Sequence, residues 1–149
     1  MKKQRLGTVF LVLAGILALA GTIIYWINTH GGYYSDFQVN TILYAIAGIV
    51  ILIVLESLNK ITGEYQWMDI LYILAAVLFS WAAVSFLGAR VESAAVILGS
   101  SLEEGNVLAK QSLFMAFGGI GCFILGMLLT GVAGFFDQKK QLQRCIKGT

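Results

Sequence analysis

Charged residues are scarce in this chain, and proline is absent. Asp, Glu, Lys and Arg make up 12% of its 149 residues, whereas hydrophobic residues make up 58%. A soluble domain carries roughly 25% charged and about 45–50% apolar residues. The low charge therefore argues against a soluble enzyme and against a soluble nucleic-acid-binding domain.

The scarcity of proline, cysteine and histidine bears on helix continuity, disulfides and metal binding. The chain has no proline, which predicts unbroken helices and argues against the interrupted helices of many transporters. Its two cysteines, Cys122 and Cys145, are predicted to lie mid-membrane and in a terminal tail, so no disulfide framework is expected. His30 is the single histidine and has no second His or Cys near it in the sequence. We therefore expect neither a metal site nor a cofactor.

Four long stretches contain no charged residue. They run over 6–35, 37–55, 70–89 and 111–136. Each is long enough for the roughly 20 residues that a helix needs to cross a bilayer core, where backbone groups must be satisfied within the segment. The sequence therefore predicts an all-α bundle of four transmembrane helices near 6–28, 39–58, 67–87 and 112–136, forming a single integral membrane domain over 1–149.

Lysine and arginine are distributed unevenly between the two sides of this bundle. The side that holds both termini and the 59–66 loop carries Lys2, Lys3, Arg5, Lys60, Lys139, Lys140, Arg144 and Lys147. The opposite side carries Arg90 and Lys110. Because cytoplasmic connections are enriched in positive residues, we expect both termini in the cytoplasm and a location in a bacterial cytoplasmic membrane.

Small residues recur at intervals of four along the fourth predicted helix. The set is Gly118, Cys122, Gly126, Thr130 and Gly134. Helices in a membrane associate through close packing, and small residues let their backbones approach. The stripe therefore predicts a helix-packing interface, either inside the bundle or facing outward onto a second copy or another membrane protein.

Ionisable residues are absent from the middle of every predicted span, although such residues usually mark proton and ion pathways. Glu56 and Asp69 lie near the ends of the second and third spans, at the cytoplasmic boundary. Glu56 has Lys60 one turn further on, and Asp69 lies in the first turn of its helix, so local electrostatics account for both. The alternative is a paired-carboxylate proton or cation site formed by Glu56 and Asp69.

The connection over 88–111 is the longest, and apolar residues recur in it at helical spacing. Either it extends the third and fourth helices beyond the membrane as an outer hairpin, or residues 91–102 lie flat on the outer leaflet. In the preceding 31–37 loop, Tyr33, Tyr34 and Phe37 are candidate anchors for a partner. We therefore predict an outer contact surface, with an interfacial aromatic belt as the alternative.

The tail over 137–149 is basic. Its cations Lys139, Lys140, Arg144 and Lys147 are expected to contact anionic lipid headgroups, at about 1 kcal/mol each. Nucleic-acid binding needs a larger basic surface with stacking aromatic rings. No nucleic-acid partner is therefore expected.

These features favour a non-enzymatic polytopic membrane protein that acts as an assembly or accessory subunit. Its partners would be the lipid bilayer and either further copies of itself or another membrane protein. No residue set predicts catalysis, because the serines and threonines have no base near them. The alternative is a small transporter or channel for an uncharged or lipidic substrate, lined by Tyr44, Ser80, Ser85 and Thr130.

Overall fold

The computed structural model describes residues 4–31, 33–61, 67–99 and 105–147. These residues form four helices: α1 (Gln4–His30), α2 (Val39–Ile61), α3 (Met68–Gly99) and α4 (Val107–Lys147). All four are long and apolar enough to cross a membrane. The predicted all-helical architecture with four spans is thus confirmed, and the chain has the build of an integral membrane protein.

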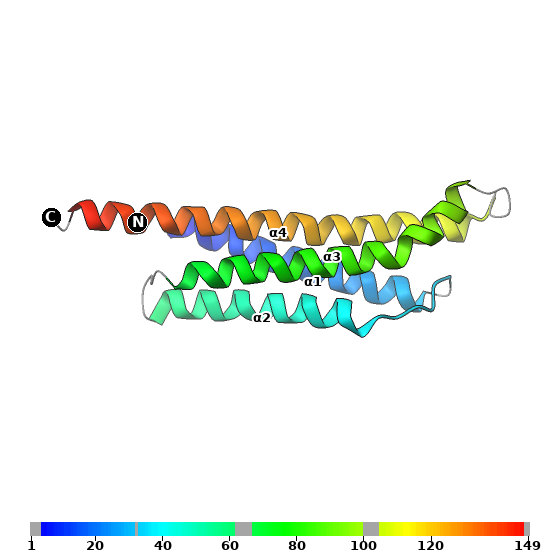
Figure 1. Cartoon of the computed structure of the whole chain (residues 1–149), viewed down its shortest axis with the longest axis horizontal. Helices are drawn as coiled ribbons and strands as arrows, with labels where there is room; N and C mark the ends of the chain where they lie inside the picture. The colour runs from blue at the N-terminus through cyan, green and yellow to red at the C-terminus, as the bar shows by residue number, and fades with distance from the viewer. Residues whose placement is uncertain (1–3, 32, 62–66, 100–104, 148–149) are drawn as a thin grey trace.

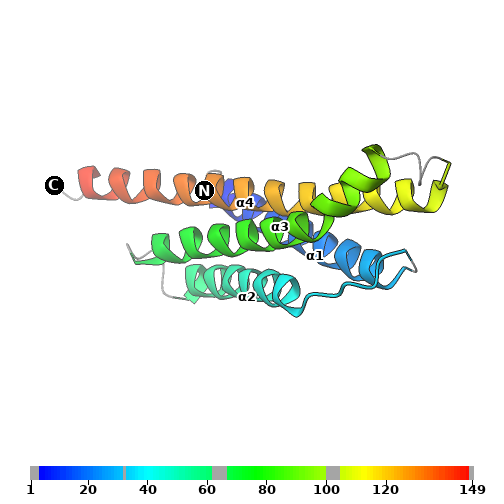
Figure 2. The same ribbon diagram turned by 45° about the vertical axis from the view of Figure 1, so that its right-hand side comes forward.

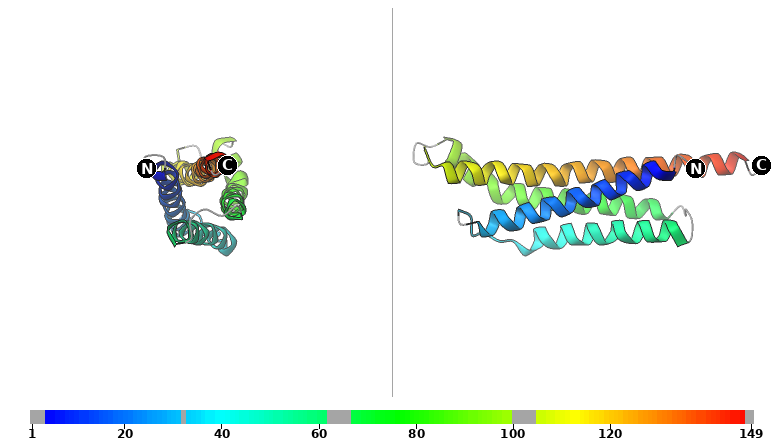
Figure 3. Two further views of the ribbon diagram at one scale, coloured as in Figure 1. Left: turned by 90° about the vertical axis from the view of Figure 1, so that its left-hand side faces the viewer. Right: turned by 180° about the vertical axis from the view of Figure 1, so that it is seen from behind.

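The helices run up and down in chain order and form a four-sided bundle (Figures 1 and 3). The start of α1, the end of α2, the start of α3 and the end of α4 lie at one end, which we call the termini end. The end of α1, the end of α3, the start of α4 and residues 31 and 33–38, which we call the 31–38 segment, lie at the other, which we call the hairpin end. α1 packs mainly against α4, α4 also packs against α3, and α3 packs against α2, whereas the contact between α1 and α2 is smaller.

All four helices are longer than the predicted spans, α3 and α4 by the most. α3 has 32 residues and α4 has 41, or roughly 48 Å and 61 Å at a rise of about 1.5 Å per residue, against a hydrocarbon core of about 30 Å. α3 runs unbroken to Gly99, so residues 91–99 continue the helix, and its last turns cross the start of α4 (Figure 2). A count of charge-free residues marks only the hydrocarbon crossing, and α3 continues beyond it, where Ile97 packs with Ala109 and Leu113 of α4.

The turn between α3 and α4 has a local explanation. The side-chain oxygen of Asn106 accepts a hydrogen bond from the backbone N–H of Ala109, at 3.1 Å. This caps α4 as Asn does at many helix starts. Gly105, one residue earlier, has a φ of 97°, a conformation that side chains with a Cβ rarely adopt.

The interior consists of three clusters along the bundle. Near the termini end, Leu55, Tyr72 and Phe79 are among the buried residues. Toward the hairpin end, Tyr25, Phe86 and Phe123 fill the interior. The last cluster joins Tyr34 to Ile97, Ala109 and Leu113, and so packs the extension of α3 onto the start of α4. Large aromatic side chains therefore fill the bundle from its membrane-spanning part to the hairpin end.

Candidate functional site

The most polar buried site of the described residues surrounds Arg90 at the hairpin end. Arg90 lies on α3 and is 1% exposed. Its Nε donates a hydrogen bond to Oδ1 of Asn28 on α1 at 2.9 Å, and its Nη1 donates to Oδ2 of Asp36 at 2.6 Å. The guanidinium carbon lies 3.8 Å from the centre of the Tyr34 ring. We call Asn28, Tyr34, Asp36 and Arg90 the arginine cluster.

The arginine cluster joins three helices to the 31–38 segment. The amide nitrogen of Asn28 donates to the backbone oxygen of Ser112 on α4, at 2.7 Å, while its oxygen accepts from Arg90. Asp36 and Tyr34 bring the connecting segment onto the same guanidinium. A buried cation is costly unless it is paired and hydrogen-bonded, so this arrangement makes the position of each element depend on the others.

One nitrogen of the guanidinium is buried without a bond. Among the residues that the structure describes, Nη2 of Arg90 has no hydrogen-bond partner. The flat face of the guanidinium is instead covered by the Tyr34 ring, and Phe86 lies 5.7 Å away on the same helix. Cation–π contact of this kind compensates part of the lost hydration.

The surroundings of Tyr34 shift the pKa of its phenol. Burial raises the pKa of its phenol above the ordinary value of 10.0, and the positive charge of Arg90 opposes part of that increase. Tyr33 packs edge-on against Tyr34, with ring centres 4.8 Å apart. Tyr34 is therefore an internal residue of the hairpin end.

The end of the 31–38 segment is held by Tyr25 of α1. Its hydroxyl accepts a hydrogen bond from the backbone N–H of Gln38 at 2.8 Å and donates to the backbone oxygen of the same residue at 3.1 Å. Phe37 packs against Trp26 at 5.6 Å and against His30 at 5.4 Å between ring centres, and it is partly exposed. Of the three predicted outer aromatic residues, Phe37 is the most exposed, Tyr33 is half-buried and Tyr34 is buried.

The five small residues of α4 face three different surroundings. A Cβ at Gly118 would meet nothing within 4 Å, and Cys122 is half-buried. Gly126 and Thr130 are buried, and a Cβ at Gly126 would lie 3.5 Å from the backbone oxygen of Ala14 on α1. A Cβ at Gly134 would lie 3.4 Å from Tyr72 on α3. The stripe therefore turns from the outside of the bundle at Gly118 to its inside at Gly126.

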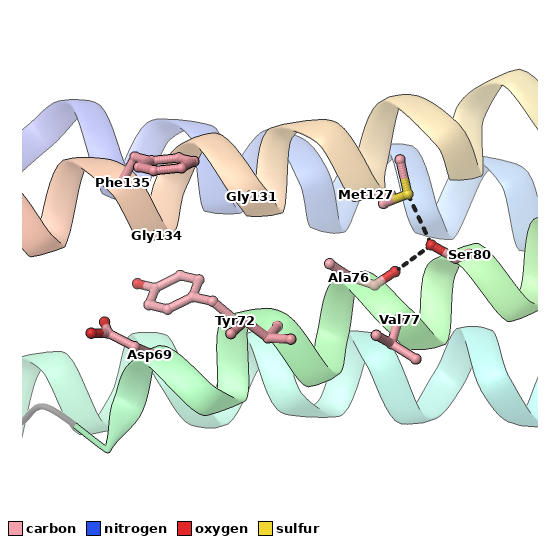
Figure 4. Close-up of a pocket in the computed structure, with 10 residues that line it drawn as sticks. Asp69, Tyr72, Ala76, Val77, Ser80, Met127, Gly131, Gly134 and Phe135 are labelled. Atoms are coloured by element: carbon pink, nitrogen blue, oxygen red, sulfur yellow. Dashed lines mark hydrogen bonds between the residues drawn. The ribbon is translucent and has the colours of Figure 1, made fainter.

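The structure places the two carboxylates of the termini end in separate grooves. Glu56 lines a groove of about 420 Å³ between α1 and α2. Asp69 lines another of about 330 Å³ between α3 and α4 (Figure 4). Neither of these two grooves is lined by both carboxylates, and no group of three or more His, Cys, Asp or Glu residues able to hold a metal occurs in the described part of the chain.

The hydroxyl groups considered for a transport path are engaged in local contacts. Ser80 donates to the backbone oxygen of Ala76 at 2.9 Å and contacts Sδ of Met127 at 2.8 Å. Thr130 donates to the backbone oxygen of Gly126 at 2.8 Å.

The remaining two lie closer to the hairpin end. Ser85 shares a 2.8 Å hydrogen bond with Thr41, and the ring of Tyr44 packs against Trp81, with centres 5.9 Å apart. Of the four residues, Thr130 is buried, Tyr44, Ser80 and Ser85 are half-buried, and Ser80 lines the groove between α3 and α4.

The basic tail lies on the last turns of α4, which project past the other helices at the termini end (Figure 1). The side chains of Lys139, Lys140, Arg144 and Lys147 lie outside the described part of the structure.

Comparisons of the chain with protein-family models, with curated proteins and with solved structures found no match. The class of protein is therefore defined by the fold alone.

Sequence reasoning did not single out Arg90, although it is the centre of the hairpin end. It was counted only as one of two positive residues on its side of the membrane. Asn28 and Asp36 lie 62 and 54 residues away from Arg90 in the chain. No short-range spacing in the sequence therefore predicts the cluster. The available signal is an arginine directly after the charge-free run over 70–89, inside a continuing apolar helical pattern.

Proposed function

We propose that this chain is a non-enzymatic structural subunit of a membrane assembly and that it pairs with a second copy of itself through the outward face of α4. The pairing face consists of Gly118, Gly121 and Cys122 on the half of α4 nearer the hairpin end. The proposal includes the predicted orientation, with the termini in the cytoplasm and the hairpin end outside.

One observation carries the proposal. A Cβ at Gly118 or at Gly121 would meet nothing within 4 Å. Glycine in a helix costs about 1 kcal/mol relative to alanine, and here packing within the chain does not require it. A bare helix surface does allow a second helix to approach closely in a membrane.

The surroundings of these glycines support a second copy as the neighbour. At about 100° per residue, Gly118, Gly121 and Cys122 lie within a sector of roughly 100° on α4. The exposed side chains of Phe114 and Leu125 lie in the same sector, about one turn before Gly118 and about one turn after Cys122. Such a face is complementary to itself across a two-fold axis, which is the commonest symmetry of homo-oligomers.

The native cysteine provides a direct test. In a Cys145→Ser variant, Cys122 is the only cysteine, and a symmetric pairing of α4 places the two Cys122 residues near each other. Mild oxidation of membranes is expected to yield a covalent dimer, and Gly118→Leu is expected to abolish it. Gly131→Leu is the matched control, because Gly131 also has open space beside it and lies roughly 140° from Gly118 around α4; it is expected to leave the dimer unchanged.

Size measurement in mild detergent completes this test. The wild type is expected to have the mass of a dimer, and Gly118→Leu that of a monomer with unchanged helix content. A wild-type monomer that gives no crosslink would contradict self-association. A protein of different mass crosslinked specifically to Cys122 would replace the second copy with another partner.

Orientation needs a separate measurement. A cytoplasm-active reporter fused after residue 149 is expected to be active, and the same reporter inserted between residues 105 and 106 inactive. The reverse pattern would contradict the assigned orientation without affecting the pairing face.

A further inference from the structure

The groove between α3 and α4 is a second feature of α4, separate from the pairing face. It has a volume of about 330 Å³ and lies in the half of the bundle nearer the termini end (Figure 4). Ile73 and Val77 of α3 and Met127 and Phe135 of α4 line it. Ile73, Val77 and Phe135 are exposed at the surface of the bundle, so the groove opens sideways toward the lipid.

Two glycines shape the α4 wall of this groove. A Cβ at Gly131 would meet nothing within 4 Å, whereas one at Gly134 would lie 3.4 Å from Tyr72. Packing within the chain thus accounts for Gly134 and does not account for Gly131. A larger side chain at Gly131 would occupy the groove without first displacing a neighbour.

The charged side chain of the groove lies at one end. Asp69 and Tyr72 lie at its end nearer the termini, where Figure 4 shows both side chains between α3 and α4. Ser80 lies at the other end, and its hydroxyl already contacts Ala76 and Met127. An amphiphilic molecule with its polar head at Asp69 would therefore match the groove.

The length of the groove fits one leaflet. Asp69 and Ser80 are eleven residues apart on one helix, a rise of roughly 16 Å. This is about half of a hydrocarbon core of about 30 Å. A lipid chain whose head lies at the boundary of the membrane extends to this depth.

We propose that this groove holds one acyl chain of a lipid whose head group carries an ammonium group, placed beside the Asp69 carboxylate. The negative charge of Asp69 favours a cationic head with N–H donors, since charge-assisted hydrogen bonds are the stronger ones. A choline head has no N–H donor. A glycerol head has no cation to offset the phosphate, so its net negative charge would be repelled by Asp69. The inferred ligand is thus an aminolipid of the ethanolamine type, bound at the leaflet of the termini end.

The test compares Gly131→Leu with Gly118→Leu. Both replace a glycine of α4 that has open space beside it, but only Gly131 lines the groove. The full chain is reconstituted with equal amounts of phosphatidylethanolamine, phosphatidylglycerol and phosphatidylcholine, extracted in mild detergent, and its retained lipid is identified by native mass spectrometry. The wild type and Gly118→Leu are expected to retain one phosphatidylethanolamine per chain, and Gly131→Leu to lose it.

The Asp69→Asn variant tests recognition of the lipid head group separately from binding of the acyl chain. This variant is expected to lose the preference for phosphatidylethanolamine by about tenfold, the effect of losing one charged hydrogen bond, while the groove still accepts a chain. Equal retention by Gly131→Leu and the wild type would contradict the groove as the site. An unchanged lipid preference in Asp69→Asn would contradict the assigned head group.

The outcome is independent of the proposed pairing. Gly118→Leu is expected to break the dimer and keep the lipid, and Gly131→Leu to do the reverse. Circular dichroism of both variants confirms that the helices are intact before the lipid is counted.

Discussion

Arg90 and Asp36 form an ion pair in which the base is buried and the acid reaches water. Nη1 of Arg90 lies 2.6 Å from Oδ2 of Asp36, and the two side chains are 1% and 44% exposed. Asp36 can therefore be hydrated without its partner, whereas Arg90 depends on its contacts within the protein. The two residues are not equivalent for stability, although they make the same hydrogen bond.

Replacing either member of the pair is expected to destabilise the protein. Asp36→Asn keeps an acceptor for Nη1 but leaves the buried Arg90 cation without a counter-charge, at a cost of about 3 kcal/mol. Arg90→Met removes the buried charge and leaves Asp36 hydrated, but it also leaves the oxygen of Asn28 unpaired, at a cost of about 1–3 kcal/mol. Arg90→Lys does not replace the arginine, because a compact ammonium cannot bond Asn28 and Asp36 while covering the Tyr34 ring. Equilibrium unfolding in mixed micelles gives these values.

Lys110 is the control for the Arg90 variants, because it is exposed at the same end of the bundle. Lys110→Met is expected to change the free energy of unfolding by less than about 0.5 kcal/mol. Similar values for Arg90→Met and Lys110→Met would show that the arginine cluster does not stabilise the hairpin end.

Neighbouring glycines on α4 are expected to respond oppositely to alanine. A Cβ at Gly119 would lie 2.8 Å from Cε1 of Phe86 and 2.9 Å from Cγ2 of Ile24. Since both neighbours are packed, Gly119→Ala is expected to cost about 1–3 kcal/mol. Within a single chain Gly118→Ala meets open space, and it is expected to be neutral or to stabilise the monomer by up to about 1 kcal/mol. Thermal unfolding of both variants as monomers, in a detergent that dissociates the proposed dimer, compares the two, and a larger loss at Gly118 would contradict the described rotation of α4.

Alkaline pH is expected to weaken the hairpin end through Tyr34. Burial raises the pKa of its phenol above 10.0, so the folded state holds this proton more tightly than the unfolded state does. The resulting stabilisation is complete below pH 10.0 and is lost as the pH rises through the folded-state pKa. Tyr34→Phe removes this dependence, and the free energy of unfolding of the variant should fall less steeply above pH 10.0. Parallel curves for the two proteins would count against a buried phenol.

Water should reach the end of α3 but not its middle. Val84 and Leu98 are 66% and 67% exposed, and Leu98 lies roughly 21 Å further along the helix. In a background without the native cysteines, Leu98→Cys is expected to react with a membrane-impermeant thiol reagent, and Val84→Cys to stay unlabelled. Equal labelling of both would contradict a transmembrane α3, because their exposure within the chain is matched.

The four helices were predictable because hydrocarbon imposes a simple rule on sequence. Long charge-free runs can satisfy their backbone in hydrocarbon only as helices, and each of the four runs lies wholly or largely within a helix long enough to span a membrane. The ends of α3 and α4 were not predictable in the same way. Residues 91–99 are stabilised by contacts such as that of Ile97 with Leu113. The sequence of one helix alone does not determine which residues of the next helix it will contact.

The small-residue stripe shows a limit of periodicity. A spacing of four residues advances about 40° beyond a full turn, so Gly118 and Gly134 differ by roughly 160° around α4. Regular spacing therefore distributes the set over several neighbours, from open space at Gly118 to α1 at Gly126 and α3 at Gly134. The sequence identifies close-packing residues, while their neighbours depend on how the helices are arranged around α4.

α1 is synthesised long before α4, the helix against which it packs most extensively. α1 ends at His30, and α4 begins only at Val107. Ribosomes add roughly 5–20 residues per second, so the flank of α1 that includes Ala14 waits several seconds for its own partner. Lipid or the insertion machinery must cover that flank during translation, and the ring of helices closes last, where its first and final members meet.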